Sequence, residues 1–383
     1  MNDSDITTEG ISKKLDRLTS FLAQDPDNLN LLADVADIAL RARDYAISRS
    51  AIKHALDLQP DDPYFKLRLS TLAISENKIE ESLAITESLL QQGHNDAAIK
   101  FNHVFALVSL ERFEEAKGPL TELFLEDTDF PKLAHLLIRT HHYLGEMDEA
   151  IETAHKYLDT HPDDGEIMGM LSLLYFDNDD LEQAKTYADR ALKIRSNNLD
   201  ALLAGGGSAL GFENIEESKL LLNKALDIEP TQGRAWVTLG LIDLIGADLT
   251  KAEEHLRQAV KYMPEHIGSW HVLAWAQLLQ KDIQSAESSF LTALALDNNF
   301  GETHGGLAVI AALKGEWGKA AEFSKIAKRL DPESMSPLYA QILRLEHEGR
   351  TESAQQIIDK VLKTSTLPNG STLFEFLGKH LKR

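Results

Sequence analysis

Three histidines, His135, His141 and His142, lie close together in the sequence, and their side chains are of a type that could bind a metal. His135 and His142 are seven residues apart, which places them on one face of a helix, but Arg139 falls between them. A cation between two ligands opposes metal binding, and no carboxylate or cysteine joins the pair at ligand spacing. We therefore expect no metal site here. His141 falls at a helix-packing position, as does His103, so we expect structural roles for both.

Two glycine-rich stretches could in principle hold a phosphate or a nucleophile. The stretch from Gly315 to Lys319 lacks the spacing of a phosphate-binding loop, and no strand precedes the stretch from Gly205 to Ser208. The chain has no cysteine, which excludes disulfides, thiol catalysis and cysteine-ligated metals. We therefore expect no catalytic residues, no cofactor and no enzymatic activity.

The elements that carry these residues recur with a fixed period of 34 residues. Trp236-x-x-Leu239-Gly240 is followed 34 residues later by Trp270-x-x-Leu273-Ala274. A small residue also recurs at the twentieth position of every repeat, where it lets two helices approach closely. In this register the repeats begin at Leu29, Pro63, Ala97, Pro131, Gly165, Leu199, Gly233, Ile267, Gly301 and Met335. Such a period indicates a repeat architecture, because one helix pair cannot bury its apolar face alone.

This spacing resembles that of the tetratricopeptide repeat family. The resemblance implies an all-α fold, a right-handed α-solenoid superhelix of about ten helix-turn-helix repeats over residues 29–368. First helices would line the concave face and second helices the convex face. Residues 1–28 are expected to form a polar tail and an N-terminal capping helix, from Ile11 to Gln24, and residues 369–383 a C-terminal capping helix. Neither end is long enough for a catalytic domain.

Composition limits the classes of partner. The net charge of −22 repels phosphate backbones and anionic membranes, so we expect neither nucleic-acid binding nor membrane insertion. The N-terminus lacks the basic and apolar regions of a signal peptide. We expect a cytoplasmic protein that is a monomer or a weak oligomer.

The family resemblance also indicates where a ligand would lie, because ligands of this family usually occupy the concave channel. It assigns the second, fifth, ninth, twelfth and thirteenth positions of each repeat to that channel. Six of the 50 residues so assigned are acidic and four are basic, so the channel is nearly neutral and the acid lies elsewhere. The candidate partner-binding residues are Tyr64, Phe101, Phe105, Lys132, His135, Arg139, His142, Tyr143, Phe176, Leu210, Leu241, Trp275 and Tyr339. Tighter packing between repeats is the alternative role for the apolar members.

Two local features of the channel stand out. Lys132, His135, Arg139 and His142 would form a basic wall beside aromatic residues, suited to a carboxylate. Glycines inside first helices are costly. Gly207 and Gly305 are expected to face the channel, where they would admit a ligand backbone or form a bending point.

Two functions from different classes fit these observations. The first is a non-enzymatic scaffold, chaperone or adaptor that binds an apolar or amphipathic polypeptide segment in the concave groove. The second is a regulatory or targeting subunit of an enzyme complex, which binds a folded partner through its acidic convex face. The ninth positions lack the asparagine of adaptors that bind the acidic tails of heat-shock chaperones, so that binding mode is not expected.

Overall fold

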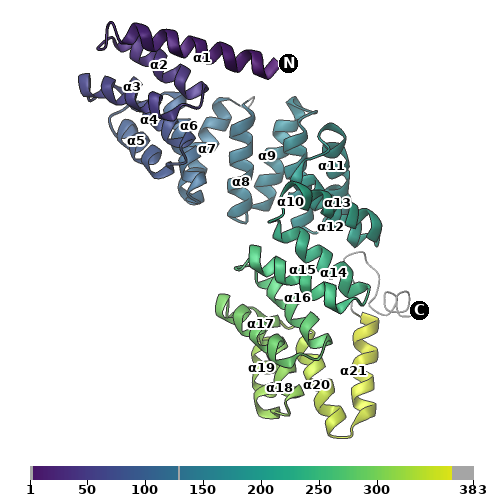
Figure 1. Cartoon of the computed structure of the whole chain (residues 1–383). Coiled ribbons are helices and arrows are strands. Elements are labelled where there is room, and N and C mark those ends of the chain that lie inside the picture. The colour runs from purple at the N-terminus through teal and green to yellow at the C-terminus, as the bar shows by residue number, and fades with distance from the viewer. Residues whose placement is uncertain (1–2, 128–129, 365–383) are drawn as a thin grey trace. The chain divides into compact units, whose positions relative to one another are not determined.

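The computed structural model describes residues 3–127 and 130–364, and these residues form 21 α-helices and no strand (Figure 1). The chain divides into two compact units, Met1–Pro162 and Asp163–Arg383. The protein is thus an all-α solenoid of paired helices.

The first unit holds a single helix followed by four helix pairs. Its helices are α1 (Asp3–Leu22), α2 (Leu29–Arg41), α3 (Tyr45–Leu58), α4 (Pro63–Ser75), α5 (Ile79–Gln91), α6 (Ala97–Ser109), α7 (Phe113–Glu126), α8 (Pro131–Tyr143) and α9 (Met147–Thr160). Leu15 and Leu18 of α1 are buried in a core with Leu32 and Val35 of α2. The helix α1 therefore covers the first repeat, but it begins at Asp3, before the expected start at Ile11.

The second unit holds six helix pairs. Its helices are α10 (Gly165–Asp177), α11 (Leu181–Ile194), α12 (Leu199–Gly211), α13 (Ile215–Ile228), α14 (Gly233–Ile245), α15 (Leu249–Tyr262), α16 (Ile267–Leu279), α17 (Ile283–Leu296), α18 (Gly301–Leu313), α19 (Trp317–Leu330), α20 (Ser336–His347) and α21 (Thr351–Thr364). The even-numbered helices from α2 to α18 begin at the first residues of the sequence repeats, and α20 begins one residue late. The C-terminal capping helix expected over 369–383 lies outside the described residues.

The turn inside each pair has the same backbone geometry in all ten repeats. The fifteenth residue of each repeat has a left-handed backbone conformation, with φ between 58° and 76°. These residues are Arg43, Asn77, Glu111, Gly145, Asp179, Glu213, Ala247, Lys281, Gly315 and Gly349. The next residue donates its N–H to a carbonyl five residues back, as Asp44 does to Ala39 at 2.8 Å. This bond satisfies a carbonyl at the end of the first helix and fixes the direction of the second.

The small residue at the twentieth position allows close contact within a pair, as expected. Ser48 donates its hydroxyl to the carbonyl of Ala36 at 2.9 Å, and Ser218 bonds in the same way to Gly206 at 2.7 Å. Both serines are fully buried, so each hydroxyl needs the partner it has.

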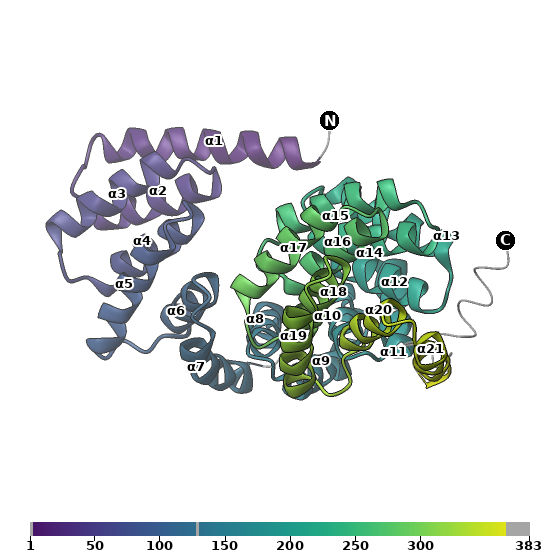
Figure 2. The ribbon, with the colours of Figure 1, turned by 90° about the horizontal axis from the view of Figure 1, so that it is seen from below.

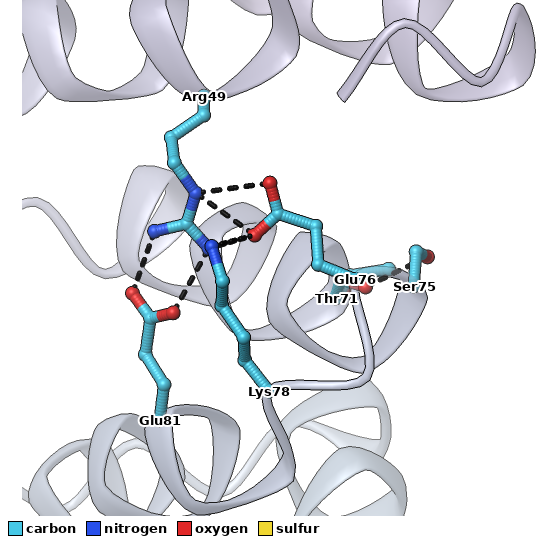
Figure 3. A network of polar contacts seen from close by, with 6 residues as sticks. All are labelled: Arg49, Thr71, Ser75, Glu76, Lys78 and Glu81. Carbon is cyan, nitrogen blue, oxygen red and sulfur yellow. Dashed lines mark hydrogen bonds and ion pairs between the residues drawn. The ribbon is translucent and has the colours of Figure 1, made fainter. Parts of the chain in front are cut away.

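A polar network joins the first two repeats (Figure 3). The Arg49 guanidinium on α3 bonds to Glu76 at the end of α4, with 2.9 Å from Nε to Oε2, and to Glu81 on α5, with 2.7 Å from Nη1 to Oε1. Lys78 adds a 2.7 Å contact to Glu76. The hydrogen bonds from Arg49 hold the pKa of both carboxyl groups below the ordinary value. The network therefore fixes α3 against the turn between α4 and α5.

In the second unit, successive first helices touch one another as well as their own partners. Contacts join α10 with α12, α12 with α14, α14 with α16 and α18 with α20 (Figures 1 and 2). The first helices from α10 to α16 therefore form one continuous surface. Within the described residues, no helix is both long enough and apolar enough to cross a bilayer.

Candidate functional site

The surface of first helices in the second unit is hollowed by a pocket of about 270 Å³, here called the α10–α14 pocket. Apolar side chains from three successive first helices supply most of its lining. The lining residues are Leu173, Phe176, Asp177, Leu203, Leu222, Arg234, Val237, Thr238, Leu241, Met263 and His266. Two of the candidate residues from the sequence, Phe176 and Leu241, therefore meet in one site.

Glycines shape this pocket by receiving side chains from neighbouring helices. A Cβ on Gly207 of α12 would lie 2.4 Å from the ring of Phe176, and a Cβ on Gly233 of α14 would lie 2.3 Å from Cγ of Met263. Both glycines are buried. The ring and the thioether can therefore pack this close to the two helices only because no side chain occupies either position.

An ion pair bridges the pocket across α12. Nη1 of Arg234, on α14, lies 2.6 Å from Oδ1 of Asp177, at the end of α10. The Asp177 side chain is 18% exposed and that of Arg234 is 43% exposed. The pair links repeats that are not neighbours, and it places a polar edge beside an apolar floor.

His266 forms part of the wall and also caps α16. Its Nδ1 accepts the N–H of Ser269 at 3.1 Å, and the hydroxyl oxygen of Ser269 lies 2.7 Å from the same nitrogen. Burial lowers the pKa of His266, and the positive charge of Arg234 lowers it further, against a smaller opposite effect of Asp177. The neutral imidazole is therefore the form that suits both the cap and the pocket.

The pocket can hold an apolar side chain and offer charged groups next to it. Its floor is hydrocarbon, and its charged groups form a single pair at one edge. In residues 3–127 and 130–364, no three His, Cys, Asp or Glu side chains are grouped as metal ligands would be. The arrangement favours recognition of a side chain.

The other candidate residues on the first helices of the second unit lie outside this pocket. Trp275 packs edge-on against Phe290 at 5.9 Å between centroids and lies 6.4 Å from Tyr339. Leu210 is half-buried against the core around Leu222. Tyr339 is 43% exposed. These contacts show that Trp275 takes part in packing between helices while part of its surface stays exposed.

In the first unit, the candidate residues of α6 and α8 form an aromatic and basic surface. Phe101 lies 6.2 Å from Phe105 and 5.3 Å from Phe130. Arg139 lies over the ring of Tyr143 at 5.4 Å, and that ring stacks on Phe113 at 4.6 Å.

The remaining members of the basic wall differ in exposure. Lys132 is exposed, as is Arg139, while His135 and His142 are half-buried. His142 lies 6.0 Å from the ring of Tyr143. His141, by contrast, is buried and bonds through Nδ1 to Glu146 at 2.7 Å. Tyr64 stands apart on α4, where Arg68 lies over its ring at 3.4 Å.

Some expectations for the channel are wrong. Gly207 and Gly305 do not face open space: both are buried, Gly207 under Phe176 and Gly305 against Ser336, where an added Cβ on Gly305 would lie 2.6 Å from the Cβ of Ser336. Val108 and Val309, which were assigned to the channel, are 3% and 0% exposed. The fifth, ninth and twelfth positions of these helices also touch neighbouring helices, and packing prevails there.

Acidic residues assigned to the channel are already engaged. Asp37 bonds to Arg68 at 2.7 Å, and Glu166 pairs with Arg195. Glu302 accepts the N–H of Met335 at 3.0 Å and the hydroxyl of Ser334 at 2.5 Å, so it holds the start of α20.

Met263, His266 and Thr238 line the pocket but were not among the candidates. Met263 and His266 lie in the loop before α16, outside the first-helix positions that the family pattern assigns. In the sequence, only Gly233 pointed to Met263: a glycine at the start of a buried helix leaves a space that a side chain from elsewhere must fill, and here Met263 fills it.

The family model described as Tetratricopeptide repeat matches residues 165–198, which coincide with one sequence repeat. Human IFIT1 dimer with m7Gppp-AAAA is similar in structure, with a TM-score of 0.55 and 14% identity over 91% of this chain and 94% of that one. The APC/C hetero-tetramer Cut9-Hcn1 gives a TM-score of 0.54 at 13% identity over 94% of this chain and 85% of that one. A tetratricopeptide repeat protein from Parabacteroides merdae gives 0.50 at 14% identity, over 61% and 93%. No curated protein is significantly similar in sequence. At these identities the likeness is one of fold.

Proposed function

We propose that this chain, a tetratricopeptide-repeat protein, is a non-enzymatic scaffold that binds a segment of a partner protein on its first helices. The observation that carries the proposal is the α10–α14 pocket. An apolar side chain of the partner enters the pocket, and the first helices of the second unit hold the rest of an apolar or amphipathic segment. Large apolar side chains in a well-formed pocket dominate the binding energy of such interfaces.

The geometry of the pocket supports a protein partner. Its volume of about 270 Å³ suits one or two side chains and is small for a cofactor. The half-buried Leu173, Val237 and Leu241 leave apolar surface that a partner can cover. The surface formed by Phe105, Arg139 and Tyr143 in the first unit is a second contact of the same kind, where Arg139 would orient an acidic group.

A crosslinking experiment tests the proposal. A photoreactive residue is placed at Leu241 in one variant and at Glu254, exposed on the second helix α15, in another. Crosslinked partners are identified by mass spectrometry after irradiation in cells. We expect capture of one defined partner from position 241. Capture from position 254 alone would instead favour a regulatory or targeting subunit that binds through its second helices.

A matched pair of variants then measures the contribution of the pocket. Thr238→Arg fills the mouth of the pocket, and Thr250→Arg makes the same change at an exposed site on α15. We expect Thr238→Arg to weaken binding of the captured partner roughly thirtyfold, as loss of an interface anchor does, and Thr250→Arg to leave it unchanged. Equal affinities for the two variants would refute the pocket as the binding site.

A further inference from the structure

A second hollow lies at the other end of the second unit, beside α20, and its lining has the opposite charge to the protein. Two pockets, of about 410 and 1100 Å³, adjoin there and share Lys328 and Gln341. The helices α19, α20 and α21 that carry them lie next to one another (Figure 1). We call the two pockets together the α19–α21 groove.

The smaller pocket of the groove lies where α19 lacks a large side chain at one repeat position. In the three preceding repeats this position, which recurs every 34 residues, holds Leu222, Leu256 and Phe290. These side chains are at most 1% exposed. The corresponding residue in α19 is Ser324, which is half-buried and lines the groove. The apolar lining of this pocket comes from Trp317, Ala320, Pro337 and Ala340, which do not fill the space that a large side chain at position 324 would occupy.

Cations surround this apolar floor. The two pockets together are lined by Lys325, Lys328, Arg344, Arg350 and Lys360, and by one acid, Glu333. Arg344 and Arg350 both contact Glu348, at 2.8 and 3.5 Å. Lys325 and Lys328 are exposed, and neither has an ion pair within the described part of the chain.

The lining departs strongly from the charge of the rest of the sequence. Residues 1–313 contain 27 Lys and Arg against 52 Asp and Glu, whereas residues 314–383 contain 12 against 9. Basic residues thus outnumber acidic ones in the part of the chain where the groove lies. Since electrostatic complementarity selects partners of opposite sign, the groove distinguishes an acidic segment from the basic ones that the remaining surface attracts.

We propose that the α19–α21 groove is a docking site for an acidic segment of a partner protein, separate from the α10–α14 pocket. An apolar side chain of that segment rests against Trp317 and Ala340 and takes the place left by Ser324. Carboxylates on either side of it pair with Lys325, Lys328 and Arg344.

The chemistry of other occupants fits less well. The chain's own residues 365–383 contain three basic residues and one acid, so they carry the same sign as the groove. A nucleic acid would bring its phosphates close to a protein whose other 313 residues carry a net charge of −25.

A library of random 12-residue peptides, selected on the full-length protein, tests the proposal. We expect enriched peptides that combine acidic residues with a large apolar one. One such peptide is synthesised, and its affinity is measured by fluorescence anisotropy at low and at high salt. Affinity should fall as salt rises. Enrichment of neutral or basic sequences, or no enrichment, would overturn the proposal.

Two sets of variants locate the binding. Ser324→Leu restores the side chain of the neighbouring repeats, so it should fill the groove and weaken peptide binding at least about tenfold without lowering the melting temperature. Lys325→Glu with Lys328→Glu should also cost at least about tenfold. The control pair, Lys193→Glu with Lys224→Glu, makes the same charge change on exposed second-helix sites and should change affinity less than about twofold.

Three outcomes would refute the assignment. Full affinity in Ser324→Leu would show that the peptide binds elsewhere. Equal losses in the two charge-reversal pairs would show that only net charge matters. A 12-nucleotide RNA that binds more tightly than the peptide, and loses binding in Lys325→Glu with Lys328→Glu, would identify a nucleic acid as the occupant.

Discussion

Several glycines within the helices of this protein leave space into which side chains of neighbouring helices pack. Gly207 accepts Phe176, Gly240 accepts Leu256, and Gly306 accepts the ring of Phe290. The energetic cost of glycine in a helix is thereby offset by closer packing. A glycine that looks anomalous in one helix is explained by a residue in another.

The pair Gly306 and Gly318 tests this explanation. A Cβ on Gly306 would lie 2.3 Å from the fully buried ring of Phe290, whereas a Cβ on Gly318 would meet nothing within 4 Å. We expect Gly306→Ala to destabilise the protein by about 2 kcal/mol through overpacking. Gly318→Ala should stabilise it by about 0.5–1 kcal/mol through helix propensity. Urea denaturation of both variants measures this, and equal effects would contradict it.

Single titratable groups also set how stability depends on pH. Burial lowers the pKa of His266, and also that of His103 and His271. A histidine whose folded-state pKa is depressed contributes stability that is complete above its unfolded pKa of about 6.5. That contribution is lost as pH falls from there towards the folded-state pKa, because the unfolded state then binds more protons.

The variant His266→Asn isolates one of these groups. Asparagine can still cap α16, but it does not titrate. We expect the free energy of unfolding to fall less between pH 7.5 and 5 in this variant than in the wild-type protein. Chemical denaturation at a series of pH values measures the difference, and parallel curves would show that His266 does not contribute.

At the scale of the helix pair, the left-handed fifteenth residue is the common feature. Non-glycine residues pay about 1 kcal/mol or more for this conformation. We expect Ala247→Gly, at φ 60°, to stabilise the protein by about 0.5–1 kcal/mol, and Gly145→Ala, at φ 74° in open space, to destabilise it by a similar amount. Thermal denaturation of both variants gives the sign of each change in stability. Two changes of the same sign would be inconsistent with backbone strain at the fifteenth residue.

Pairs are joined to each other by polar contacts as well as by apolar ones. Removal of Arg49 leaves Glu76 and Glu81 close together with only Lys78 to compensate. We expect Arg49→Ala to destabilise the first unit by about 1–2 kcal/mol, since the Arg49 and Glu76 side chains are only 16% and 12% exposed. The difference from the wild-type protein should shrink as pH falls and the two carboxylates are protonated. A loss that is independent of pH would point to lost packing of the arginine chain instead.

The sequence predicts elements far better than it predicts the site. Helix starts follow from a fixed period, because each repeat solves the same packing problem. The Asp177–Arg234 pair could not be predicted, since it joins residues 57 apart whose meeting depends on how α12 packs between them. Phe176 and Leu241 were identified because they are large apolar residues at positions that first helices expose. Met263 lies in the loop between α15 and α16, where the 34-residue period does not predict which way a side chain points.

For the whole molecule, the division into two units predicts local effects of core changes. Phe290→Ala removes a fully buried ring and should cost about 3–5 kcal/mol. Solenoids lose stability mainly among neighbouring repeats. We expect faster amide hydrogen exchange from α16 to α19 and unchanged exchange in α2 to α5. Uniform loss of protection would show that the chain unfolds as one cooperative body.

The shared geometry of the fifteenth residue has a consequence for how this chain can change in length. Every second helix leaves its partner through the same left-handed step and the same hydrogen bond, whichever amino acid occupies the turn. A duplication or deletion of one whole 34-residue block therefore joins backbones that already match, and it needs no compensating substitution in the turn. Descendants of this gene can gain or lose first-helix surface in whole modules, while an insertion of any other size shifts the repeat register.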